Sequence, residues 1–128
     1  MSESGEFDLL ASSLRADASD LGVFVEVLAS KLELSFPQSV RVERKGGGLR
    51  GGEKRVRRLE VDLDDHRYEL EAERGRVDCR RRTVVRGIAL KNEELSLDEW
   101  IDALSRGLAA AAAETEQGRV ALQRMLEG

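Results

Sequence analysis

The chain has 128 residues and a formal net charge of −4, with 41% hydrophobic, 36% charged and only 4% aromatic residues. This length suits a single domain, 1–128, with a core built mostly of leucine, valine and alanine. Cys79 is the only cysteine, which excludes an intrachain disulfide and is typical of a reducing cytoplasm. No leader is evident and no apolar run approaches the roughly 18 residues of a membrane span. We therefore expect a cytoplasmic protein with no membrane span.

Basic residues gather in the middle of the chain. Between Arg41 and Arg86 there are 15 basic and 10 acidic residues, whereas the rest of the chain has 6 basic and 15 acidic residues. The middle is therefore positively charged on an otherwise acidic protein. A positive region of this kind favours contact with nucleic acid or with an acidic protein surface.

The first predicted element is a helix that runs from about residue 11 to Pro37, which disfavours the helical conformation at Phe36. Its apolar residues recur at spacings of three and four, at Ala11, Leu14, Ala18, Leu21, Val25, Leu28 and Leu32. Gly22 weakens the pattern, so two shorter helices are an alternative. We expect this stripe to pack against a sheet, and an exposed partner-binding face is the other interpretation.

From Ser39 onward apolar residues alternate with charged ones, which predicts four antiparallel strands with one solvated face. The inward positions are Val40, Val42, Leu59, Val61, Leu63, Tyr68, Leu70, Ala72, Val77 and Cys79. Two-residue turns at Asp64-Asp65 and Arg74-Gly75 would connect the later strands as a meander.

These turns predict which side chains face each other across the strands. Asp62 falls opposite Arg67 and Glu73 opposite Arg76, and each such pair contributes roughly 0.2–1 kcal/mol. Glu60 falls opposite Glu69, which is unfavourable. The balance still predicts a meander with a largely self-neutralising charged face.

Arg81 breaks the alternation, because its position falls on the apolar face opposite Tyr68. We expect a β-bulge or a strand end near Arg81 to reset the register. An apolar run resumes at Thr83.

The last predicted element is a long helix. Ser96 and Glu99 have the spacing of a capping box, and Leu95 and Trp100 have that of a hydrophobic staple. Apolar or small residues then recur to the C-terminus, over nearly 30 residues or on the order of 43 Å. The far end of such a helix should meet another helix, either in the same chain or in a second copy. The candidate residues for self-association are Leu104, Leu108, Ala111, Thr115, Gly118, Leu122 and Met125.

The expected fold is therefore an α+β two-layer domain, with an N-terminal helix, a four-stranded antiparallel β-meander and a long C-terminal helix. This layout is similar in outline to that of small nucleoid-associated proteins and small acidic secretion chaperones, which are typically dimeric. No motif can be carried over from either class, so the layout alone implies no function.

A glycine-rich stretch joins the first two predicted strands. Gly46, Gly48 and Gly51 match the G-x-G-x-x-G spacing, but a strand follows them where a dinucleotide site requires a helix. A P-loop is excluded as well, since Glu53 stands where the lysine is needed. We interpret the stretch as a flexible hairpin loop.

Basic side chains surround this loop and make it a candidate binding element. The candidate residues for an anion or partner site are Arg44, Lys45, Arg50, Lys54, Arg55, Arg57, Arg80 and Arg82. Such hairpins bind nucleic acid through phosphates, although no aromatic residue is interleaved for base stacking. Docking to an acidic protein surface is the other interpretation.

Signals for chemistry are weak. Asp62, Asp64, Asp65 and His66 could bind a metal, but a polar turn explains them more simply. Cys79 lies on the inward alternation, where a thiol is usually inert. We expect no catalytic residue, metal, cofactor or small-molecule substrate. The sequence favours a small non-enzymatic interaction or adaptor module that forms a homodimer through its C-terminal helix and binds an unidentified protein. The alternative is a nucleoid-associated-like protein that binds nucleic acid through the basic hairpin 41–58.

Overall fold

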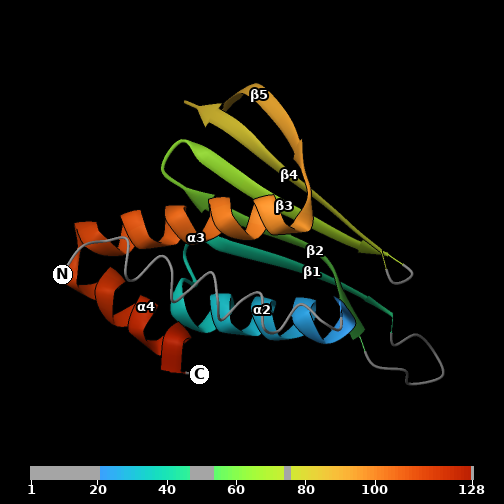
Figure 1. Cartoon of the computed structure of the whole chain (residues 1–128), viewed down its shortest axis with the longest axis horizontal. Coiled ribbons are helices and arrows are strands. Elements are labelled where there is room, and N and C mark those ends of the chain that lie inside the picture. Colours follow the sequence, from blue (N-terminus) through green and yellow to red (C-terminus); the bar gives the residue numbers. More distant parts are fainter. Residues whose placement is uncertain (1–20, 47–53, 74–75, 128) are drawn as a thin grey trace.

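The fold is an antiparallel sheet with helices packed on one of its faces (Figure 1). The computed structural model describes residues 21–46, 54–73 and 76–127. The elements are α2 (Leu21–Ser35), β1 (Val40–Gly46), β2 (Lys54–Leu63), β3 (His66–Glu73), β4 (Arg76–Val85), β5 (Ile88–Leu95), α3 (Leu97–Glu114) and α4 (Glu116–Glu127). The predicted α+β class is confirmed.

The strands lie in the order β1-β2-β3-β4-β5, so each strand pairs with its neighbour in the chain. Asp62 lies opposite Arg67 and Glu73 opposite Arg76, as the turn positions predicted. β1 pairs with β2 as a hairpin up to Gly46 and Lys54. The glycine-rich loop between them and the turn at 74–75 lie outside the described residues.

The sheet has five strands rather than the four predicted, because β4 runs straight through Arg81 to Val85. Arg86 and Gly87 then both adopt positive φ, at 55° and 80°, and form the tight turn into β5. The predicted reset at Arg81 was wrong, since the irregularity lies between Thr83 and Val84.

Arg81 therefore stays on the helix-covered face, opposite Tyr68. Its guanidinium Nη2 lies 3.0 Å from Oε1 of Glu93 on β5. This ion pair explains why an inward arginine is tolerated there, and it holds the pKa of the Glu93 carboxyl below its usual range.

The helices cover the sheet from one side, with α2 over β1 and β2 and α3 mainly over β4. Phe24, Leu28 and Leu32 of α2 and Trp100 and Leu104 of α3 are buried in the same core as the inward strand residues. The predicted packing of the N-terminal stripe against a sheet is thus confirmed over α2. Its residues before Leu21 lie outside the described part of the chain.

The predicted capping box at the start of α3 is confirmed. The Glu99 amide donates to Ser96 Oγ at 3.2 Å, and the Ser96 amide donates to Glu99 Oε1 at 2.9 Å. The bond from the Ser96 backbone lowers the pKa of the Glu99 carboxyl.

The C-terminal segment forms two helices rather than one. Thr115 has extended backbone angles, φ −138° and ψ 155°, and its Oγ1 accepts the Gly118 amide at 2.9 Å as a cap for α4. A Cβ at Gly118 would lie 2.9 Å from Cα of Ala112, so glycine permits this close turn. α4 consequently folds back to contact both α3 and α2.

This fold-back changes the setting of the residues predicted to mediate self-association. Leu104, Leu108, Leu122 and Met125 are buried in the core of the single chain. The close contact predicted for the small residues is made within the chain, by α3 and α4. Self-association remains a prediction, but these four buried residues offer no free surface for it, and only Thr115 of the predicted set is exposed.

Among the described helices, none combines the length and apolar character that a membrane crossing requires.

Candidate functional site: a basic-rimmed groove

The face of the sheet that points away from the helices, here called the outer face, is lined by paired charges. Arg41 Nη2 lies 2.8 Å from Glu60 Oε1, and Arg67 Nε lies 2.8 Å from Asp62 Oδ1. Arg58 Nη2 lies 2.9 Å from Glu60 Oε2. The predicted self-neutralising face is confirmed.

Glu69 is the centre of the outer face and is only 1% exposed. Its carboxylate lies 3.4 Å from Arg58 Nη2 and 3.3 Å from Arg82 Nε. Arg58 therefore bridges Glu60 and Glu69, which offsets the unfavourable pairing of these two carboxylates across β2 and β3.

Several predicted binding residues belong to such pairs and do not form a common site. Arg44 binds both carboxylate oxygens of Glu33 on α2, at 2.6 and 3.1 Å, which lowers the pKa of that carboxyl. Arg80 lies 3.8 Å from Glu71 and Arg82 contacts Glu69, both on the outer face. Arg50 lies outside the described residues.

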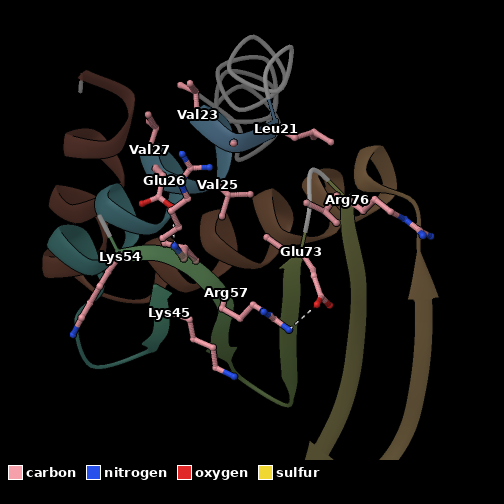
Figure 2. A pocket seen from close by; sticks show the side chains of 15 residues that line it. Leu21, Val23, Val25, Glu26, Val27, Lys45, Lys54, Arg57, Glu73 and Arg76 are labelled. Carbon is pink, nitrogen blue, oxygen red and sulfur yellow. Dashed lines mark hydrogen bonds and ion pairs between the residues drawn. The ribbon is translucent and has the colours of Figure 1, made fainter. Parts of the chain in front are cut away.

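The other predicted cations surround an open groove of about 840 Å³. The groove lies between the first half of α2, the free end of the β1–β2 hairpin, and the adjoining ends of β3 and β4 (Figure 2). Its apolar walls are formed by Leu21, Val23, Val25, Val27, Val56, Ala72 and Val77. Its charged rim consists of Lys45, Lys54, Arg55, Arg57 and Arg76, with Glu26 and Glu73 as the acidic residues.

A β-bulge shapes the floor of the groove. Glu43 pairs with Arg58 and Arg44 with Val56, so Arg57 is an extra residue on β2. The bulge turns Val56 inward, where it is 4% exposed, and places Arg57 at the rim. The Val56 amide donates to Glu26 Oε2 at 2.7 Å, which ties α2 to β2 at this point.

The rim has more positive charge than its own carboxylates neutralise. Arg57 lies 3.1 Å from Glu73, and Lys45 lies 3.9 Å from Glu43. Within residues 21–46, 54–73 and 76–127, no carboxylate lies within ion-pair distance of Lys54, Arg55 or Arg76. Figure 2 shows the side chains of Lys45, Lys54 and Arg76 extending outward around the groove. Among the described residues, the rim therefore offers cations without a carboxylate partner beside an apolar surface.

Sequence reasoning missed part of this groove. Arg76 was used only as a strand partner of Glu73, and the apolar wall on α2 was not predicted. A signal for that wall does exist, because Val23 and Val27 lie off the apolar stripe of α2 and widen its apolar surface beyond what the core needs. Val23 is 55% exposed.

The residues considered for metal binding or catalysis do not come together in the described part of the chain. Asp62 binds Arg67 on the outer face, whereas His66 lies beside Tyr68 with a ring separation of 6.2 Å. In the described part of the chain, no three His, Cys, Asp or Glu side chains are grouped so as to hold a metal. Cys79 is buried, and this burial raises the pKa of its thiol to about 12.

Comparison with known proteins does not extend these observations: the chain matches no protein-family model, no curated protein and no solved structure. The groove with its apolar walls and cationic rim is thus the feature on which a functional interpretation depends. Such a surface has the chemistry to hold a ligand with both apolar groups and negative charges.

Proposed function

We propose that the protein is a non-enzymatic interaction module that holds an acidic, amphipathic segment of a partner protein in the groove. The observation that carries this proposal is the juxtaposition of exposed Val23 with Lys54, Arg55 and Arg76, three cations that have no carboxylate partner among the described residues. Apolar side chains of the partner would cover the walls, and its carboxylates would meet the rim.

The apolar walls and the cationic rim of the groove contribute to partner binding in different ways. Burial of apolar surface supplies most of the binding free energy in such contacts, at roughly 25 cal/mol per Å². The exposed cations attract an acidic partner and select its orientation, but they are screened by salt. A purely acidic or purely apolar segment would satisfy only one half of the surface.

The proposal is tested with a peptide of about 16 residues, or four to five helical turns, in which leucine repeats at helical spacing and glutamate fills the other positions. Calorimetry with the full chain should detect binding that weakens as salt increases. Two control peptides carry lysine in place of glutamate, or serine in place of leucine. Each control should bind at least about tenfold more weakly, a difference of ~1.4 kcal/mol. Equal binding of all three peptides, or of none, would contradict the proposal.

Nucleic acid is a second candidate. It is favoured by Lys54 and Arg55, which follow the glycine-rich loop in the sequence and have no carboxylate partner among the described residues. The apolar walls argue against it, because the lining residues of the groove include no aromatic side chain on which a base could stack. Fluorescence anisotropy with labelled duplex and single-stranded DNA at low salt separates the two candidates. Binding that depends on Lys54 and Arg55 and falls steeply with salt would support this second function.

A further inference from the structure

Strand β5 forms one edge of the sheet, and in the described residues no strand pairs with its outer side. Its residues Ile88, Leu90 and Lys91 are 62%, 65% and 67% exposed. An exposed edge strand presents a row of backbone donors and acceptors that can pair with another strand. β5 is therefore open to strand addition.

The opposite edge, β1, is less suited to pairing. α2 packs beside β1, and Glu33 of α2 reaches across to Arg44. β5 keeps a regular register with β4 from Lys91 to Leu95, and its own bulge lies just before this stretch, at Leu90.

The charges of β5 restrict which strand can be added. Consider a second copy whose β5 pairs antiparallel with this one about a two-fold axis. If the axis passes through Lys91, Glu93 or Glu94, that residue lies directly opposite its own copy, and like charges face each other. Centred on Asn92, the same pairing places Lys91 opposite Glu93 of the second copy, and this pair of opposite charges occurs twice. Within its own chain Glu93 already lies 3.0 Å from Arg81 and 3.9 Å from Lys91, so it would share its carboxylate with the second copy. Among the two-fold pairings centred on residues 91 to 94, only the one centred on Asn92 places opposite charges across from each other.

We infer that two copies of the chain associate edge to edge through β5, antiparallel and centred on Asn92, to form one continuous ten-stranded sheet. The pairing would bring the exposed Ile88 of each copy near the start of α3 in the other, where Leu97 is half-buried. The lining of the groove includes no residue of β5, so the groove stays accessible in both copies. This association does not depend on the proposed peptide binding.

Cysteine cross-linking of the full chain tests the register. In the proposed dimer, the two copies of residue 92 have Cα atoms about 4.5–5.5 Å apart, within the range that a disulfide spans. Asn92→Cys should therefore give a covalent dimer under mild oxidation. Glu94→Cys is the matched control on the same face of the same strand, because the two copies of residue 94 would lie about 13 Å apart. The native thiol of Cys79 is buried and gives little background.

A charge variant provides a second readout. Adding Lys91→Glu to the Asn92→Cys chain replaces each favourable pair with two carboxylates that face each other across the two copies. Cross-linking should slow about tenfold, which corresponds to ~1.4 kcal/mol over the two pairs. Circular dichroism of each variant checks that the fold is kept. Efficient cross-linking of Asn92→Cys alone supports the inference. Equal cross-linking at residues 92 and 94, none at 92, or no effect of Lys91→Glu would overturn it.

Discussion

The outer face of the sheet and the groove draw on the same basic stretch of sequence, yet their charges have opposite roles. On the outer face, Arg58 and Arg82 surround the buried carboxylate of Glu69. At the groove, Lys54 and Arg55 have no carboxylate partner among the residues that the structure describes. Arginines of the first kind stabilise the fold, whereas cations of the second kind are the ones that we propose to contact a partner.

The difference shows that the number of basic residues in a segment does not predict a binding surface. Strand alternation and pairing decide which guanidinium meets a carboxylate. In β2, the bulge at Arg57 interrupts the alternation, and the pairing of β2 with β3 ends at Arg58 and Glu71. The groove begins where the ladder of opposite charges ends.

The largest effect on stability is expected at the centre of the outer face. Glu69→Gln keeps the side-chain shape but removes the counter-charge of Arg82 and leaves Arg58 paired with Glu60 alone. The free energy of unfolding should fall by about 2 kcal/mol, less than for a fully buried pair because both arginines are about one-third exposed. Urea denaturation measures this change. A loss below about 0.5 kcal/mol, typical of a surface substitution, would contradict the assigned role of Glu69.

Replacing the groove cations should weaken peptide binding and leave stability nearly unchanged. The triple variant Lys54→Ala, Arg55→Ala and Arg76→Ala should weaken binding of the acidic leucine peptide about tenfold, or ~1.4 kcal/mol. Its unfolding free energy should change by no more than about 0.5 kcal/mol per residue.

A matched control removes three paired cations from the outer face: Arg41→Ala, Arg67→Ala and Arg80→Ala. This variant has the same loss of charge but should keep the peptide affinity, while each lost pair lowers stability by roughly 0.2–1 kcal/mol. If both triple variants bind the peptide equally, general charge attraction and not the groove controls recognition.

Arg44 tests, at a single residue, whether a cation stabilises the fold or binds the peptide. It was predicted as a binding residue, but its guanidinium is engaged by Glu33. Arg44→Ala should lower stability by about 0.5–1 kcal/mol and leave peptide affinity unchanged. The pKa of Glu33, followed by NMR, should rise toward its usual value in this variant. A large loss of peptide affinity would return Arg44 to the binding site.

The smallest expected effect is the response to acid. The carboxyls of Glu33 and Glu93 have lowered pKa values because Arg44 and Arg81 bind their ionised forms. Their stabilising contribution is therefore complete above the ordinary carboxyl pKa of about 4.3 and is lost as pH falls through the folded-state pKa. Glu33→Gln and Glu93→Gln should each make the unfolding free energy less sensitive to acidification, as urea titrations between neutral and acidic pH would show. Peptide affinity at neutral pH should not change.

Much of the fold could be predicted from the sequence because its signals are local. Alternation and two-residue turns placed Asp62 opposite Arg67, and the Ser96 capping box marked the start of α3. The break at Thr115 was missed because the apolar spacing continues through it unchanged, and β5 was missed although Arg86-Gly87 repeats the signal of Arg74-Gly75.

The candidate site was less predictable because it depends on tertiary placement. The sequence indicated the cations near the glycine-rich loop, but pairing removed Arg44, Arg80 and Arg82 from the site. The wall on α2 and the contribution of Arg76 arise only where α2, β2 and β4 come together. Linear charge patterns carry no information on this arrangement.

The most direct test of the central claim is an NMR titration of the full chain with the acidic leucine peptide. The backbone amides of Val25, Val56 and Val77, which line the groove, should shift in proportion to peptide bound. Those of Glu60, Glu69 and Glu71 on the outer face should remain in place. Shifts concentrated on the outer face, or no shifts at all, would contradict the assignment of the groove as the binding surface.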